Sequence, residues 1–262
     1  MKEPLVKISD LSKSFDVNNT VSSTVEQTAV INSLNLSVDA GEFVTIFGPN
    51  GCGKTTLLNI ITGVIHDYTG QIAINGKKPI DARIGYIFQN YDDSLFPWAK
   101  VWKNISFALR LEGKSRKDCM EAAEMLTSQL DITLPLDSYP YQLSGGQKQL
   151  VAICRALLFE PDLLVMDEPF SSLDHEARFI MQDKIQWLWK EKELTILFVS
   201  HEIDEAIFLA DRLLLMTKRP SHVHSYYDIS LPRPRHHKIM EEENFFKIRT
   251  EVLKSFREVM AK

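Results

Sequence analysis

The chain has 262 residues, of which 44% are hydrophobic and 25% are charged, and its formal net charge is −5. This composition is typical of a globular protein with a sizeable core, and it excludes disordered, collagen-like and coiled-coil classes as the main architecture. The acidic balance offers no basic footprint, so we expect no nucleic acid partner. Cys52, Cys119 and Cys154 are too widely spaced for a disulfide framework or a paired-cysteine zinc site.

The sequence shows no candidate membrane segment. No apolar run approaches the ~18 residues that a spanning helix needs. The charged start of the chain is not followed by the apolar stretch of a signal peptide. We therefore expect a cytosolic protein, or one that a partner holds at a membrane.

The first third of the chain is predicted to be rich in strands. Runs of alternating or continuous apolar residues predict strands at Leu5–Phe15, Ala29–Val38, Glu42–Phe47, Gln71–Ile74 and Ile84–Phe88. The polar segment Asp16–Thr28 is predicted to be a loop, and Lys54–Thr62 a helix. Early strands joined by short turns suggest an antiparallel piece.

The middle of the chain alternates helices with short strands. Residues from Ser94 to about Leu158 are predicted to be mostly helical. Apolar runs predict strands at Leu163–Met166, Ile196–Val199 and Leu213–Met216, and a helix is expected at Glu176–Glu191. This alternation predicts a parallel sheet in an α/β core.

The end of the chain is predicted to be an arm followed by a helix. Pro220–Pro234 holds three prolines and is expected to be a linker or an irregular arm. Glu241–Lys262 is expected to be an amphipathic helix that packs on the protein's own core. Its apolar stripe consists of Phe245, Ile248, Val252, Phe256 and Val259.

A glycine-rich segment carries the strongest chemical signal. Residues Gly48–Thr55 read GPNGCGKT and match the pattern G-x-x-x-x-G-K-[ST] between a predicted strand and a predicted helix. Glycines let backbone N–H groups cradle an anion at the positive end of the helix dipole. Lys54 would then reach the β- and γ-phosphates of a nucleotide, and the Thr55 hydroxyl would ligate Mg²⁺. At this helix N-terminus we expect Cys52 to have a lowered thiol pKa, and to react unless nucleotide shields it.

Two carboxylates end a predicted strand. Asp167 and Glu168 follow the apolar run Leu163–Met166. Ligands of open α/β sheets gather at the carboxyl ends of strands. Asp167 is therefore expected in the shell of a magnesium ion, and Glu168 is expected to orient and deprotonate a water.

The run Leu143–Gln147 reads LSGGQ and precedes a predicted helix. A serine and two glycines in this place could cap the helix, or they could form a second anion cradle. A chain that binds one nucleotide has no obvious need of two cradles. The second cradle would then serve the nucleotide of a second copy.

In type and in their order along the chain, these motifs resemble those of the ATP-binding subunits of ABC transporters, and the resemblance extends over nearly the whole chain. GPNGCGKT is similar to the Walker A loop, LSGGQ to the ABC signature, and LLVMDEP to the Walker B strand. Ser172–Asp174 resembles the D-loop, His201 the switch histidine, and Gln89 the Q-loop glutamine.

The resemblance implies an α/β fold in which a P-loop NTPase (RecA-like) core carries an antiparallel β-subdomain and a helical subdomain that bears the signature. It implies an ABC ATP-binding domain at residues 1–219, with the helical subdomain at about 92–142. The C-terminal arm and helix, residues 220–262, would pack on that domain.

The resemblance also implies an ATPase that uses ATP and Mg²⁺. It assigns catalysis to Glu168, His201 and Gln89, and metal coordination to Thr55, Gln89 and Asp167. Nucleotide contacts would come from Phe15, Gly48, Pro49, Asn50, Gly51, Cys52, Gly53, Lys54, Thr55 and Thr56. Across a head-to-tail dimer, the contacts would come from Ser144, Gly145, Gly146 and Gln147, with Asp174 of the D-loop. Phe15 would stack on adenine, or it is an ordinary half-buried strand aromatic.

A narrower resemblance concerns importers of nitrate, sulfonate, taurine and bicarbonate. It rests on Leu95–Val101 (LFPWAKV), Leu231–Arg235 (LPRPR) and Phe256. The first segment would belong to a groove for a membrane subunit, or it packs in the core. Leu150 stands where the family usually has arginine, and no catalytic role is affected.

This resemblance implies an ATP-hydrolysing motor subunit that drives an importer of such a small anion. Its partners would be a second ATPase subunit, identical or not, two transmembrane permease subunits and, indirectly, an external solute-binding protein. It would lie at the cytoplasmic face of the cell membrane. The alternative is a soluble ABC ATPase of an assembly or DNA-maintenance system, although the coiled coils and paired cysteines typical of the latter are absent. No guanine-recognition motif supports a GTPase.

Overall fold

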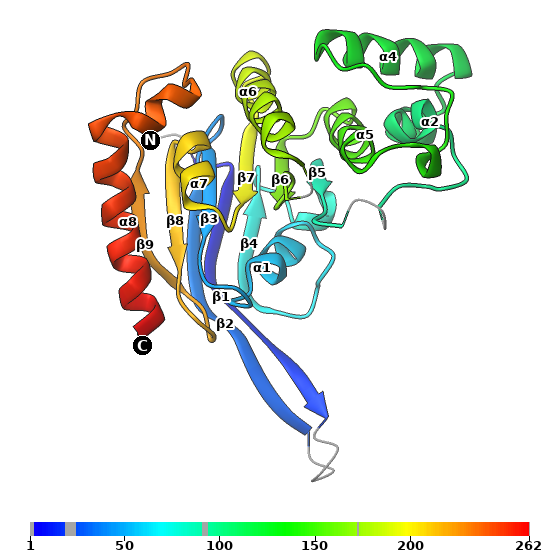
Figure 1. The fold of residues 1–262 in the computed structure, drawn as a ribbon. Helices are drawn as coiled ribbons and strands as arrows, with labels where there is room; N and C mark the ends of the chain where they lie inside the picture. The colour runs from blue at the N-terminus through cyan, green and yellow to red at the C-terminus, as the bar shows by residue number, and fades with distance from the viewer. Residues whose placement is uncertain (1–2, 19–24, 91–93, 172, 262) are drawn as a thin grey trace. The chain divides into compact units, whose positions relative to one another are not determined.

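The computed structural model describes residues 3–18, 25–90, 94–171 and 173–261 (Figure 1). Outside these ranges lie residues 19–24 of the expected loop, 92–93 of the expected helical subdomain, Ser172 and Lys262. The chain forms two compact units, one of Met1–Ala82 with Lys192–Lys262 and the other of Arg83–Glu191. Among the described residues, no helix combines the length and the apolar character that a membrane span requires.

The first unit contains an antiparallel three-stranded sheet. Its strands are β1 (Val6–Asn18), β2 (Val25–Val38) and β4 (Thr69–Ile74), in the order β2-β1-β4. Val6 of the central strand pairs with Val38 on one side and Ile74 on the other, and all three are fully buried.

The prediction of a loop over Asp16–Thr28 is wrong at both of its ends. β1 continues to Asn18 and β2 begins at Val25, with Asp16 paired to Gln27. Gln27 Nε2 donates a hydrogen bond to Asp16 Oδ1 over 3.2 Å. An antiparallel ribbon with exposed faces needs no apolar alternation, because its polar side chains pair across the strands.

The same unit contains a second group of strands, which is parallel except at one edge. β3 (Phe43–Phe47) lies between β7 (Thr195–Val199) and β8 (Arg212–Met216) and is parallel to both. All residues of β3 and β7 are buried, as continuous apolar strands of a parallel sheet should be. β9 (Val223–Asp228) pairs antiparallel with β8. The expectation of an irregular arm over Pro220–Pro234 is therefore wrong at β9, whose mixed polarity suits a partly exposed edge strand.

Helices complete the first unit. α1 (Lys54–Ile61) follows β3, and α7 (Ile203–Leu209) follows β7. The 3₁₀ turns η1 (Pro79–Asp81) and η3 (His237–Glu241) and the terminal helix α8 (Glu243–Ala261) account for the rest. In α8, Phe245, Val252 and Val259 are buried, and Phe256 contacts Phe47 with ring centroids 5.1 Å apart.

The second unit combines two parallel strands with helices. β5 (Ile84–Ile87) pairs with β6 (Leu163–Asp167). The predicted helical region contains α2 (Val101–Ile105), α3 (Phe107–Leu111), α4 (Arg116–Gln129), η2 (Pro140–Gln142) and α5 (Gly145–Leu158), which confirms the prediction. α6 (His175–Glu191) follows β6. A Ser115–Asp118 capping box begins α4.

Candidate functional site

The glycine-rich loop of the first unit joins β3 to α1 and holds a buried cation. Lys54 is 6% exposed, and its Nζ donates hydrogen bonds to the carbonyl oxygens of Gly48 (3.0 Å) and Pro49 (3.1 Å). Both acceptors are neutral, so these bonds leave the ammonium charge for a further, anionic partner. Helix α1 begins without a side-chain cap and without an acidic residue in its first turn. Its first N–H groups therefore add to an anion-binding end.

Gly53 is required by the backbone of this loop. It precedes α1 with φ +112°, a conformation that side chains rarely adopt. A Cβ atom added here would lie 2.8 Å from Val30 Cγ1. Gly51 also has a positive φ, +73°, but an added Cβ would meet open space. The remaining candidates of this loop include Asn50 and Thr55, which are exposed, and Thr56, which is half-buried.

The expectation for the Cys52 thiol is wrong. Cys52 is 1% exposed, and burial raises its thiol pKa. The charges of Lys54 and Arg219 and backbone hydrogen bonds oppose this rise without reversing it. Desolvation of the thiolate therefore outweighs the helix N-terminus, and the reactivity proposed for the empty protein loses its basis.

In the second unit, the strand pair brings together a carboxylate and an amide from distant parts of the sequence. Ile87 of β5 pairs with Met166 of β6. Gln89 and Glu168 each follow two residues later, and Gln89 Nε2 donates to Glu168 Oε2 over 3.1 Å. Glu168 has φ +48°, a sparsely populated backbone conformation for a non-glycine residue. Backbone strain of this kind occurs often at functional sites.

Asp167, one residue earlier, is 1% exposed. Burial raises the pKa of the Tyr86 hydroxyl in β5, and the negative charge of Asp167 raises it further. Asp167 and Glu168 thus follow one another in the chain but differ in environment, since Glu168 is partly exposed.

His201 lies in the first unit, in the short segment between β7 and α7. It is exposed, and its Nε2 lies 4.0 Å from Glu202 Oε1. The buried Ser200 just before it donates from Oγ to Glu205 Oε2 over 2.5 Å. The His201 ring is thus exposed, while the Ser200–Glu205 hydrogen bond fixes the segment that carries it.

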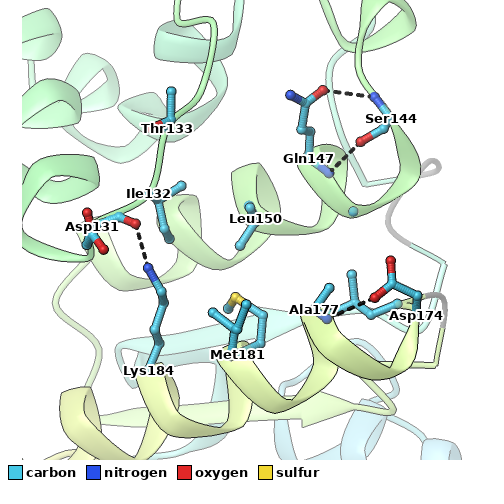
Figure 2. A pocket seen from close by; sticks show the side chains of 13 residues that line it. Asp131, Ile132, Thr133, Ser144, Gln147, Leu150, Asp174, Ala177, Met181 and Lys184 are labelled. Carbon is cyan, nitrogen blue, oxygen red and sulfur yellow. Dashed lines mark hydrogen bonds between the residues drawn. The ribbon is translucent and has the colours of Figure 1, made fainter.

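The LSGGQ segment caps helix α5. Ser144 Oγ accepts the Gln147 N–H over 3.3 Å, and Gln147 Oε1 accepts the Ser144 N–H over 3.0 Å (Figure 2). This capping box confirms the first interpretation of the motif, namely a helix cap. It does not exclude the second, because the Ser144 hydroxyl keeps its own proton to donate. Gly145 and Gly146 form the first turn of the helix.

Ser144 opens onto a cavity of about 450 Å³ between α5 and α6 (Figure 2). Asp174 lines the same cavity, and its Oδ1 accepts the N–H of Ala177 over 2.9 Å at the start of α6. Leu150 and Met181 form part of the apolar wall. The structure therefore brings the predicted signature and D-loop residues to one cavity, with the atypical Leu150 in its wall.

Phe15 lies on β1 opposite Thr28 of β2. It is 39% exposed, and Lys13 Nζ lies 4.6 Å from its ring centroid. A ring with this exposure could stack on a planar ligand, and the same exposure is also ordinary for an aromatic side chain on a strand. Both interpretations of Phe15 therefore stay open.

The segment Leu95–Val101 divides between core and surface. Leu95, Ala99 and Val101 are buried, whereas Trp98 is 76% exposed. Asn104, fully buried, holds the loop in place. Its Oδ1 accepts the Phe96 N–H over 2.8 Å, and its Nδ2 donates to the carbonyl oxygens of Phe96 (3.2 Å) and Ala99 (3.0 Å). Sequence reasoning missed this asparagine, whose signal would have been a polar residue on an apolar helix face.

Comparison with known proteins places the chain in a family. Residues 31–171 match the family model described as ABC transporter. An uncharacterized ABC transporter ATP-binding protein of Methanocaldococcus jannaschii is 38% identical over 96% of this chain and 94% of its own length. The aliphatic sulfonates import ATP-binding protein SsuB of Bacillus licheniformis is 42% identical over 88% of each chain. The chain therefore belongs to the ABC transporter family, as one of its ATP-binding, ATP-hydrolysing subunits.

A solved structure supports the same fold. A dimeric ATP-binding cassette in a post-hydrolysis state, bound to ADP and Pi, matches with a TM-score of 0.76 and 26% identity. The match covers 87% of this chain and 100% of that one. The predicted α/β P-loop NTPase fold is confirmed. The import names of the relatives do not favour the alternative of an assembly or DNA-maintenance ATPase.

Proposed function

We propose that the chain is the motor subunit of an importer for a small anion of the nitrate, sulfonate, taurine or bicarbonate type. The relatives named for import of aliphatic sulfonates, at about 40% identity, support this substrate class. Residues 1–219 would form the ATP-binding domain, with a helical subdomain at about 92–142 and a C-terminal arm and helix at 220–262.

The observation that carries the proposal most strongly is the buried Lys54 ammonium in its glycine-rich loop. Two neutral carbonyls hold it in place, so its charge is already oriented when a nucleotide arrives. Phosphates of ATP would bind along Gly48–Thr56, where N–H groups and Lys54 supply the positive potential. Adenine would stack on the exposed face of Phe15.

The residues assigned to Mg²⁺ supply suitable donors. Thr55, Gln89 and Asp167 offer a hydroxyl, an amide and a carboxylate oxygen, all hard ligands that this ion prefers. Gln89 uses its nitrogen for Glu168, which leaves its oxygen for a metal. When bound, Mg²⁺ would neutralise charge on the phosphates.

Hydrolysis would rest on three residues. Glu168 would accept a proton from the attacking water, and its bond with Gln89 would hold the carboxylate in place. His201 would donate a hydrogen bond to the γ-phosphate from its exposed ring. A base that the Gln89 hydrogen bond already orients needs little reorganisation at the moment of reaction.

Each site would be completed by a second ATPase subunit. The Ser144 hydroxyl, with Gly145, Gly146 and Gln147, would bind the γ-phosphate held by the other chain, while Asp174 would lie at the interface. The dimeric cassette that this chain resembles supports such an assembly. ATP binding would close the dimer, and hydrolysis would reopen it.

Trp98 would transmit this motion to two permease subunits. A rigidly mounted, exposed tryptophan is the kind of side chain that anchors protein interfaces. The subunit would then sit at the cytoplasmic face of the membrane through the permease, and an external binding protein would act on it indirectly.

The proposal is tested by ATP turnover of the full chain. Wild-type protein should release phosphate from ATP in the presence of Mg²⁺, and Glu168→Gln protein should bind ATP without releasing phosphate. Equal turnover by the two proteins would overturn the assignment of Glu168.

A further inference from the structure

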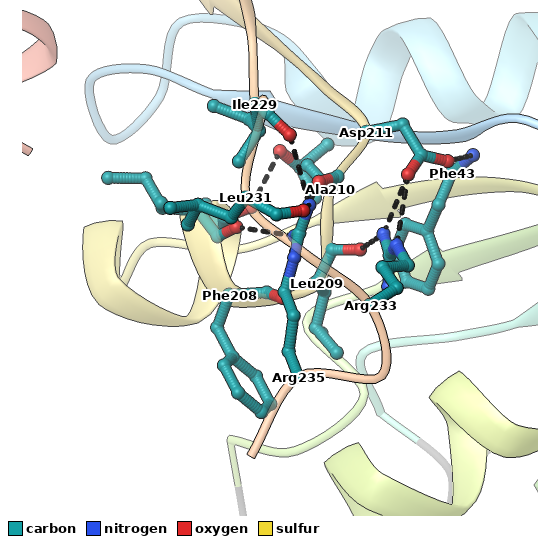
Figure 3. A network of polar contacts seen from close by, with 12 residues as sticks. Phe43, Phe208, Leu209, Ala210, Asp211, Ile229, Leu231, Arg233 and Arg235 are labelled. Carbon is teal, nitrogen blue, oxygen red and sulfur yellow. Dashed lines mark hydrogen bonds and ion pairs between the residues drawn. The ribbon is translucent and has the colours of Figure 1, made fainter. Parts of the chain in front are cut away.

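The C-terminal end of α7 is capped by two arginines that come from elsewhere in the chain (Figure 3). The last four carbonyl groups of a helix lack partners within it. Here they belong to residues 207–210. Arg235 Nη1 donates to the carbonyl oxygens of Ile207 (3.1 Å), Phe208 (2.9 Å) and Ala210 (2.6 Å). Arg233 Nη2 donates to the fourth, that of Leu209, over 2.6 Å.

The two guanidinium groups also fix the arm from which they come. Arg235 Nη2 donates to the carbonyl oxygens of Ile229 (3.1 Å) and Leu231 (3.4 Å). Arg233 pairs with Asp211 Oδ1 over 2.8 Å, while Asp211 Oδ2 accepts the N–H of Phe43 in β3 over 3.0 Å. Arg235 is 3% exposed, and burial lowers its pKa to about 10, so it stays charged at neutral pH.

The same arm contacts α7 at two further points. Arg249 of α8 forms an ion pair with Asp204 in the first turn, with Nε 2.6 Å from Oδ1. The His237 ring stacks on Phe208, with centroids 4.5 Å apart and planes at 20°. The segment from Arg233 to Arg249 thus contacts α7 from its first turn to its end.

Helix α7 is the element that follows His201. It has seven residues, about 10 Å at 1.5 Å per residue, which is too short to be stable alone. Ser200 and Glu205 tie the His201 segment to its first turn. A shift or fraying of α7 would therefore move the segment that carries His201.

We propose that Arg235, with Arg233, is a positioning residue for hydrolysis, which fixes His201 by capping α7. The inference rests on the proposed role of His201. It gives the LPRPR segment a function: to make the placement of His201 depend on the C-terminal arm. The two arginines would not contact the nucleotide and would act only through α7.

The test is a double-mutant cycle on ATP hydrolysis by the full chain. Arg235→Met removes the fork of donors, and Arg235→Lys keeps the charge but offers at most three donors. Each is made alone and together with His201→Ala. Arg212→Met is the matched control, because Arg212 Nη2 likewise donates to a carbonyl, that of Ser37 (2.6 Å) in β2, and to Glu42 (2.8 Å), and these partners are not carbonyls of α7.

We expect Arg235→Met to lower kcat about tenfold and to leave the KM for ATP within about twofold, since a misplaced catalytic group costs rate rather than binding. Arg235→Lys should lie between this variant and wild type. In the His201→Ala background, both changes should alter kcat less than about twofold, because the group that they position is gone.

Two results would overturn the inference. One is an equal loss of kcat in both backgrounds, and the other is an Arg212→Met loss as large as that of Arg235→Met. If Arg235→Met does not fold, the same cycle with Arg235→Lys decides between these outcomes. Unchanged kcat in His201→Ala alone would instead overturn the proposed role of His201, and the positioning role with it.

Discussion

Gln89 and Glu168, 79 positions apart, are joined by a hydrogen bond of 3.1 Å from the amide nitrogen to the carboxylate. The bond exists because β5 and β6 run in parallel and in register, so that residues two positions past the paired Ile87 and Met166 meet. The hydrogen bond from a neutral amide fixes the direction of the carboxylate. This arrangement suits a base that must receive a proton from water.

Glu168→Gln should therefore retain ATP binding and lose hydrolysis by at least about 100-fold, the usual contribution of a positioned general base. The amide keeps the side-chain length and can still accept from Gln89, so the loss would be chemical rather than structural. Phosphate release in a single turnover measures hydrolysis, and an equilibrium titration with ATP measures binding. Glu124→Gln, on the exposed face of α4, is the matched control and should behave as wild type.

Lys54→Ala should weaken ATP binding by at least about tenfold, because the change removes the charge that would face the phosphates. Calorimetric titration with ATP gives the dissociation constant. Lys77→Ala, an exposed lysine of the same unit, should leave that constant unchanged. Equal affinity of Lys54→Ala and wild type would remove Lys54 from the nucleotide site.

Gly53→Ala and Gly51→Ala should differ in stability although they lie two residues apart. At Gly53 a positive φ combines with a Cβ position 2.8 Å from Val30, whereas at Gly51 only the φ is unfavourable. We expect the free energy of unfolding to fall by about 2–4 kcal/mol for Gly53→Ala and by about 1 kcal/mol for Gly51→Ala. Urea denaturation without nucleotide measures both, and equal losses would contradict the steric argument.

Cys154 should make stability depend on alkaline pH. Burial raises the pKa of its thiol from 9.0 to about 12 in the folded chain. As pH rises, the thiol ionises in the unfolded chain at a lower pH than in the folded chain. The contribution of the neutral thiol to the free energy of unfolding is therefore intact below pH 9 and is lost as pH rises from 9 towards 12. The loss is about 1.4 kcal/mol per pH unit. Urea denaturation between pH 8 and 11 should show wild type losing stability faster than Cys154→Ala, and parallel losses would refute the shifted pKa.

Much of the fold was predictable because apolar periodicity is a local signal. The buried runs of β3, β6 and β7 contain little but apolar residues, and each prediction of a strand there is confirmed. The ends of β1 and β2 were not predictable in this way, since Asp16 and Gln27 are stabilised by pairing with each other across the ribbon. No single strand carries that information.

The candidate site shows the same division. The motif around Lys54 was visible because its glycines and lysine are close in sequence. The hydrogen bond between Gln89 and Glu168 depends on the register of β5 and β6, which cannot be predicted from the motifs alone. The thiol pKa of Cys52 was predicted in the wrong direction, because the helix terminus is visible in the sequence and the degree of burial is not. The role of Arg235 was missed because a proline-rich segment gave no indication that it folds back onto α7.

The most direct test of the central claim, a nucleotide site shared between two subunits, is the mass of Glu168→Gln protein measured by light scattering. With ATP and Mg²⁺ we expect a dimer of twice the 30.0 kDa chain mass, and without nucleotide a monomer. Adding Ser144→Arg should abolish the dimer but leave ATP binding intact, because Ser144 would contact the nucleotide of the other chain. A mass that stays at 30.0 kDa while ATP is bound would contradict a site shared between two copies of this chain.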